Sequence, residues 1–181
     1  MTGARDRGRV LRRFRRDETG SAILIEFVVF VPLLFTMFLM GVELGMYSIR
    51  HMFLDRGLDI AVRHVRLNTA TPMTHDDIKD MICENAGFID DCDTTLRLEM
   101  TPVNPRAFAT FDQTPDCVDL SEPVAPVRGF SLGRQHEIMI LRACVKFEPV
   151  FPTTGLGYAL EKDGSGRARM VSSAVFVQEP N

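Results

Sequence analysis

The sequence lacks the clustered side chains that an enzyme site needs. It contains 181 residues with no tryptophan and four scattered histidines. No two histidines have the spacing of metal ligands, and none stands beside a nucleophile motif. The glycine-rich stretches at 155–157 and 164–166 lack the strand–loop–helix setting of a phosphate-binding loop and indicate turns. We expect no enzymatic activity, no cofactor, no metal and no small-molecule substrate.

Cysteine is absent from the first 82 residues. The four cysteines present are Cys83, Cys92, Cys117 and Cys144. They lack the closely spaced pairs of a zinc site, so two disulfides in an oxidising compartment are expected. Four cysteines allow three connectivities. We favour Cys83–Cys92 with Cys117–Cys144, because the first pair is close in sequence and leaves the second. The acidic run "DDCD" at 90–93 lacks the ligand pattern of a calcium loop, and solvated acids are expected there.

The sequence has one long hydrophobic run. Ser21 to Val42 contains Glu26 as its only charged residue. As a helix this run is roughly 33 Å long, enough to cross a bilayer core. It is longer than the hydrophobic region of a secretory signal, and no A-x-A-like cleavage site follows it. We predict a transmembrane helix over residues 21–45.

Positive charge is concentrated ahead of this run. Residues 1–20 contain seven arginines and three acids, whereas the chain as a whole has a net charge of −3. A basic segment can bind nucleic acid, but one beside a hydrophobic run favours membrane topology, with no nucleic-acid partner. The positive-inside rule then predicts a basic cytoplasmic leader at 1–20 and an extracytoplasmic domain at 46–181.

The helix is expected to continue beyond the membrane to about residue 68, because apolar residues recur there at intervals of three and four among charged ones. These apolar residues are Met46, Ile49, Phe53, Gly57 and Ile60. Pro72 in "NTATPM" ends the pattern. A second helix is predicted over 74–87, with Thr74 as its N-cap and Gly87 after its end.

Further along the chain the apolar period changes to two. Strands are predicted at about 94–103, 137–151 and 167–178, with a long loop at 104–135 and a turn at 161–166. A small antiparallel sheet packed against the long helix would bury both apolar faces. The fold class expected is therefore α+β, with a long N-terminal transmembrane and amphipathic helix and a short second helix.

Glu26 is the most unusual residue of the hydrophobic run. A carboxylate costs about 2.5–3.5 kcal/mol near the middle of a membrane helix on insertion scales and less near its edge, and such residues are candidates for function. The alternative is that Glu26, only about 8 Å deep if Ser21 marks the membrane edge, lies at the level of the cytoplasmic headgroups and costs little. Phe27 follows Glu26, and Pro32 removes one backbone hydrogen bond from the helix. Gly41 and Gly45 have the G-x-x-x-G spacing that lets two helices approach closely. The alternative is that the two glycines have no packing role and only lie near the membrane exit.

The basic leader, Gly20, the small and apolar residues, "EF" at 26–27, Pro32 and "GVELG" at 41–45 resemble the TadE-like pseudopilins. These proteins belong to the tight-adherence (Tad/Flp) pilus systems of bacteria. The resemblance is strongest over about residues 15–60. It implies cleavage between Gly20 and Ser21 by a prepilin peptidase. Glu26 would then pair with the freed amine of a neighbouring subunit.

The position of Glu26 departs from the family pattern. The pattern places the glutamate fifth after the glycine, whereas Glu26 is sixth after Gly20. One extra residue turns a side chain by about 100° around a helix. Two alternatives follow: the peptidase accepts the shift, or the protein remains uncleaved as a membrane anchor.

The resemblance implies a minor pseudopilin that acts in assembly or priming of a Tad-type adhesive pilus. Its partners would be the inner membrane, the prepilin peptidase, other pilus assembly proteins and the major pilin. The first alternative is an uncleaved single-pass inner-membrane anchor with a periplasmic binding or scaffold domain. The second is a membrane-tethered enzyme, for which the sequence offers no clustered nucleophile, base or metal set.

Overall fold

The computed structural model describes residues 19–67, 73–106, 114–115, 117–118 and 129–180. Most of the expected leader, the segment 68–72 and much of the expected loop 104–135 lie outside the described residues. The chain divides into two compact units, residues 1–41 and 42–181. One helix contributes to both units.

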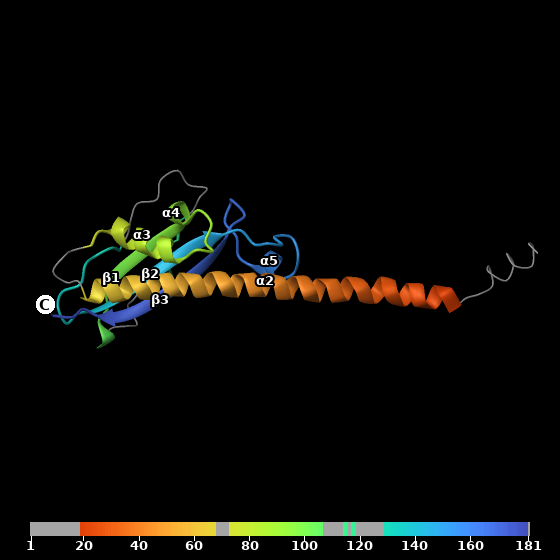
Figure 1. The fold of residues 1–181 in the computed structure, drawn as a ribbon, viewed down its shortest axis with the longest axis horizontal. Coiled ribbons are helices and arrows are strands. Elements are labelled where there is room, and N and C mark those ends of the chain that lie inside the picture. Colours follow the sequence, from red (N-terminus) through yellow and green to blue (C-terminus); the bar gives the residue numbers. More distant parts are fainter. Residues whose placement is uncertain (1–18, 68–72, 107–113, 116, 119–128, 181) are drawn as a thin grey trace, which may run out of the picture. The chain divides into compact units, whose positions relative to one another are not determined.

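Helix α2 spans Thr19–Leu67 as one continuous element of 49 residues (Figure 1). Its bounds lie within two residues of the helix expected from the sequence. Pro32 stands inside it without ending it. The hydroxyls of Thr36 and Ser48 donate to the carbonyls four residues earlier, at 2.8 Å each, so both polar groups have partners within the helix.

Two short helices follow α2. Helix α3 spans His75–Asn85 and begins with a capping box, in which the side chains of Thr74 and Asp77 each accept from the other's backbone N–H. Helix α4 spans Cys92–Thr95. The strand expected to start at residue 94 therefore starts later. Thr95 instead donates its hydroxyl to the Asp91 carbonyl and continues the helical turn.

Three strands form an antiparallel sheet in the order β1-β2-β3, which confirms the expected α+β class. Their bounds are Leu96–Pro102 for β1, Ile138–Phe147 for β2 and Ala168–Val177 for β3. The central strand is buried almost throughout. The face of β2 that points away from the core is covered in part by the Cys117–Cys144 disulfide. It is also covered by the ion pair between the Arg142 guanidinium and the Glu99 carboxylate, 2.7 Å apart.

Strand β2 is shorter than the expected strand over 137–151. Pro149 cannot donate to a sheet ladder, and the chain leaves the sheet after Phe147. The next element is the short helix α5, Gly155–Ala159, where the sequence indicates only a turn. The expected turn before the last strand is present at residues 164–166.

The core lies between the second half of α2, α3 and one face of the sheet. The side chains that α2 contributes are Leu54, Leu58, Ala61 and Val65. The sequence indicates a different stripe as the buried one, and at two of its five residues the prediction is wrong: Ile49 and Ile60 remain more than a third exposed. Met46 and Phe53 are half-buried and Gly57 is buried. Both stripes have helical spacing, and only tertiary packing selects between them.

Gly57 is the buried member of the expected stripe, and it allows α3 to pack closely against α2. A Cβ at this position would lie 2.8 Å from the carbonyl oxygen of Ile82, in α3. Any larger residue would therefore push α3 away from α2. Glycine here lets the two helices pack with backbone near backbone.

Two disulfides join Cys83 to Cys92 and Cys117 to Cys144, the pairs favoured from their order along the chain. The first connects α3 to α4, and the second ties the loop residue Cys117 to the centre of β2. Closing loops of 9 and 27 residues stabilises a fold by about 2.5 and 3.5 kcal/mol on the chain-entropy account.

Asp163 organises the turn that leads into β3. Its carboxylate accepts from the backbone N–H and hydroxyl of Ser165 and from the backbone N–H of Arg167. It also lies 3.1 Å from the ammonium group of Lys146 on β2. Burial raises the pKa of Asp163, but the hydrogen bonds and the Lys146 charge outweigh it and lower the pKa from 3.8 to about 2.

A carboxyl group whose pKa is lowered by folding stabilises the fold fully when the pH is above the pKa of the unfolded chain. That stabilisation is lost as the pH falls through the pKa of the folded protein. We therefore expect Asp163→Asn to lower the free energy of unfolding at neutral pH, and the deficit to shrink as the pH falls from 3.8 toward 2. Denaturant unfolding of the full chain in detergent at several pH values measures this. Asp80→Asn, at an exposed acid of α3, is the control. A deficit that is unchanged over this range would contradict the account.

Candidate functional site

The first half of α2 presents apolar side chains that no other described residue of its own unit covers. The large apolar residues from Ile23 to Phe38 are mostly 55–70% exposed. Among the described residues, α2 is the one helix long and apolar enough to cross a membrane. Apolar exposure on this scale is costly in water, so this half of the helix suits contact with lipid or with other apolar helices.

The residues singled out in the sequence follow one another along this helix. Gly20 and Ser21 lie in its first turn, and Glu26, Phe27 and Pro32 follow. Glu26 and Phe27 are exposed. Gly41 and Gly45 are also exposed, and a Cβ added to either glycine would meet nothing within 4 Å. The surface around them is therefore open, as close approach of a second helix would require.

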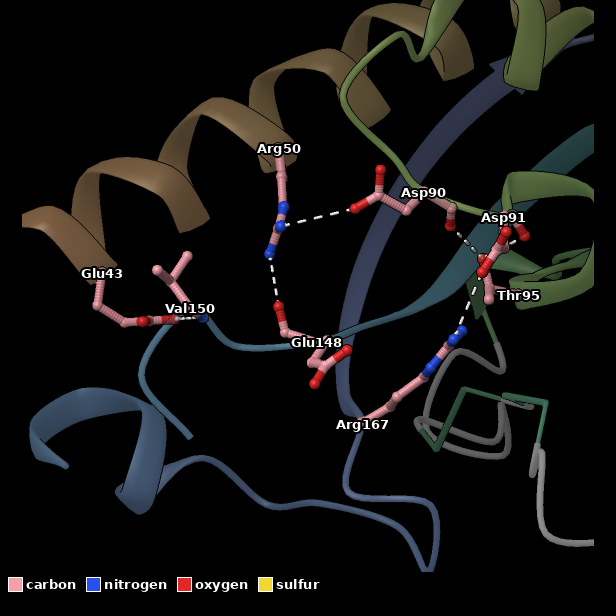
Figure 2. A network of polar contacts seen from close by, with 8 residues as sticks. All are labelled: Glu43, Arg50, Asp90, Asp91, Thr95, Glu148, Val150 and Arg167. Carbon is pink, nitrogen blue, oxygen red and sulfur yellow. Dashed lines mark hydrogen bonds and ion pairs between the residues drawn. The ribbon is translucent and has the colours of Figure 1, made fainter. Parts of the chain in front are cut away.

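Glu43 behaves in the opposite way to Glu26. It is the first residue after the apolar run, and it is only 2% exposed. Its carboxylate accepts the backbone N–H of Val150 at 3.2 Å (Figure 2). It also accepts the backbone N–H of Phe151, at 2.8 Å. Charged acceptors form the stronger class of hydrogen bond. Glu43 thus fastens the segment after β2 to α2.

Arg50 adds a second attachment two turns further along α2. It donates to the backbone carbonyl of Glu148 at 2.9 Å, and its guanidinium lies 5.4 Å from the ring centre of Phe147. A longer ion pair of 3.9 Å joins it to Asp90 (Figure 2). Glu43 and Arg50 together hold residues 147–151 against the helix.

A third set of contacts joins α2 to β3. The His51 ring lies 2.9 Å from the Asp55 carboxylate and 3.2 Å from the Val171 carbonyl oxygen. Ser172 donates its hydroxyl to Asp55. This arrangement differs from a catalytic relay, in which the serine hydroxyl would be bonded to the histidine. Its effect is to secure the helix to the last strand.

Acidic side chains gather beside the Cys83–Cys92 disulfide. Asp80, Glu84 and Asp93 line a shallow surface pocket with the two cysteines. Within the described residues, no group of three or more potential metal-ligating side chains is arranged to hold an ion. Both cysteines are consumed by the disulfide, so solvated acids remain the simplest interpretation of this surface.

The comparison with known protein families bears on the helix. Residues 20–63 match the model of the TadE-like protein family. The comparisons found no match among curated proteins and none among solved structures. The TadE-like segment, residues 20–63, begins at Gly20 and covers most of α2.

Over residues 20–63 the match confirms the resemblance recognised in the sequence. It includes Glu26, Phe27 and Pro32 as well as Glu43. The sheet and the short helices α3, α4 and α5 lie outside it. The family match therefore concerns the helix, and the attached domain must be interpreted from its own structure.

Sequence reasoning missed the role of Glu43. The residue stands out in the sequence only as part of "GVELG", although an acid beside an apolar run is costly at this position as it is at Glu26. That cost is the signal in the sequence that indicates a buried partner for Glu43. Its partners stand 107 and 108 positions away in the chain, so no local pattern could name them.

We expect Glu43→Gln to lower the free energy of unfolding by about 2 kcal/mol, because a neutral amide forms weaker hydrogen bonds and can turn only one acceptor toward the two N–H groups. Amide hydrogen exchange at Val150 and Phe151 should also become faster. Denaturant unfolding and exchange measured by mass spectrometry on the full chain in detergent test both effects.

Glu148→Gln is the matched control for Glu43→Gln, because only the backbone carbonyl of Glu148 takes part in the attachment and its side chain is exposed. It should leave both measurements near those of the parent. Equal losses in the two variants would contradict the role assigned to Glu43.

Proposed function

We propose that this protein is a minor pseudopilin that takes part in assembly or priming of a Tad-type adhesive pilus. It acts as a structural component with no catalysis of its own. The observation that carries the proposal is the TadE-like match, which falls on a continuous helix with exposed apolar side chains in its first half.

The topology proposed is a single pass through the bacterial inner membrane. The arginine-rich leader supports a cytoplasmic N-terminus. The two disulfides support a periplasmic location for the domain, since disulfides persist in oxidising compartments. The partners proposed are the prepilin peptidase, other pilus assembly proteins and the major pilin.

Glu26 has a specific part in this proposal. After cleavage between Gly20 and Ser21, the new amino terminus of one subunit would meet the Glu26 carboxylate of a neighbour. Pairing the two charges offsets the cost of burying each alone. The exposure of Glu26 in the single chain supports a partner outside the chain.

One observation favours a second candidate, an uncleaved inner-membrane anchor with a periplasmic scaffold domain. Glu26 stands sixth after Gly20, one place later than the family pattern. The domain is held to α2 by Glu43, Arg50 and Asp55, all downstream of the cleavage point. Its fold is therefore compatible with either a cleaved or an intact N-terminus.

Processing of the N-terminus separates the two candidates. In host cells with an active prepilin peptidase, we expect intact-mass analysis to find a chain that begins at Ser21. Gly20→Val should abolish this processing, because a branched side chain would replace the small residue at the cleavage point. Gly8→Val, within the leader, is the control and should be processed like the parent.

A parent chain that keeps its leader in these cells would contradict the pseudopilin proposal and leave the anchor. Normal processing of the Gly20→Val variant would instead show that the cleavage point was assigned to the wrong bond. The same preparations report both outcomes, because cleavage lowers the intact mass by the mass of residues 1–20.

A further inference from the structure

The segment between β2 and the Asp163 turn has an unusual composition. Residues 149–160, "PVFPTTGLGYAL", contain no charged side chain, although a quarter of the whole sequence is charged. Glu148 and Glu161 bound this segment, which contains α5 and is named the α5 loop. A surface segment of this length without charge requires an explanation.

The α5 loop has a defined structure. Gly157 packs against Pro149 and the Phe151 backbone, and any Cβ there would clash with that backbone. The Phe151 carbonyl accepts from the Thr154 N–H, and the Pro152 carbonyl accepts from the Lys162 ammonium group. The loop therefore holds its shape by its own contacts.

Glu43 fixes where this loop lies along α2. Two backbone N–H groups of the α5 loop are within 3.2 Å of the Glu43 carboxylate. Glu43 directly follows Val42, the last residue of the apolar run. One helical residue is an axial step of about 1.5 Å. The loop is thus attached at the level where the chain leaves the proposed membrane span. Figure 2 shows Glu43 and Val150 on one side of Arg50, and Asp91, Thr95 and Arg167 on the other.

The loop also exposes apolar side chains at this level. Tyr158 is 74% exposed and Val150 is 42% exposed. Leu44, next to Glu43 on α2, is 55% exposed. Tyrosine is enriched where membrane meets water, because its ring suits the acyl boundary and its hydroxyl suits the headgroups. Exposing the side chains of Tyr158, Val150 and Leu44 to water costs free energy, and contact with the membrane–water interface lowers that cost.

We infer that the α5 loop is a second membrane contact: it lies on the periplasmic surface of the same bilayer that α2 crosses, with Tyr158 and Val150 in the interfacial layer. The occupant of this surface is lipid, because the loop is uncharged and is attached at the end of the span. The inference rests on the proposed function only for the membrane insertion of α2. A contact beside the span would restrain the tilt of the domain on the membrane.

The absence of tryptophan from the sequence allows a direct test. Tyr158→Trp introduces a single fluorescent indole into the full chain, which is reconstituted in phosphatidylcholine vesicles. We expect a blue-shifted emission maximum, quenching by lipids brominated high on the acyl chain, and protection from the water-soluble quencher acrylamide.

Phe88→Trp is the matched control. Phe88 is also an exposed aromatic residue. The centre of its ring lies 4.8 Å from that of Phe53 on α2, and Phe53 is ten residues beyond Glu43 in the sequence. That is about 15 Å further along the helix axis. Its indole should be quenched by acrylamide and should be insensitive to brominated lipid. Phe30→Trp, within the apolar run, reports insertion of the span itself.

The three variants separate the outcomes. If the Phe30→Trp indole is quenched by brominated lipid and the Tyr158→Trp indole is not, the inference is overturned while membrane insertion stands. If neither indole is quenched, the insertion of α2 fails and the inference fails with it. Equal lipid quenching in the Tyr158→Trp and Phe88→Trp variants would also overturn the inference, because the contact would not belong to the α5 loop.

Discussion

The burial of Glu43 against two backbone N–H groups is the interaction on which the arrangement of this chain depends. Glu43 lies where α2 changes from a helix with an exposed apolar surface to a helix packed against the core. An unpaired carboxylate would be expensive at such a position, and here the loop that follows the central strand satisfies it. Arg50 and the His51–Asp55 contacts extend the attachment along α2. The helix and the sheet are consequently parts of one folded unit from Val42 onward.

This attachment connects the fold with the proposed function. In the proposed pseudopilin, the contacts of Glu43, Arg50 and Asp55 join the second half of α2 to the domain with charged groups that are buried or half-buried against it. The two disulfides stabilise other parts of the fold: one joins α3 to α4, and the other is attached to the central strand. Among the described residues of its own unit, the apolar half of α2 has no covering side chains, which is the property that lipid and neighbouring helices require.

The sequence predicted the elements that depend on local pattern. The long helix, the capped α3, the three strands and the cysteine pairs follow from periodicity, capping residues and spacing. It did not predict which stripe of α2 is buried, because the stripe with Ile49 and Ile60 and the stripe with Leu54 and Leu58 have the same helical period. It also missed the attachment of Glu43, which depends on contacts between residues more than a hundred positions apart. The helix α5 was missed because it is only five residues long and lies in a glycine-rich segment that indicates turns. The TadE-like match could be anticipated from Gly20, Glu26 and Pro32, which all lie in one local segment.

The role of the protein in pilus assembly is tested most directly by counting pili on cells that lack it. Host cells without the protein, the same cells supplied with the full chain, and unmodified cells are compared by electron microscopy. The account predicts few or no pili without the protein and recovery when the chain is supplied. Unchanged numbers of pili in its absence would contradict a part in assembly or priming.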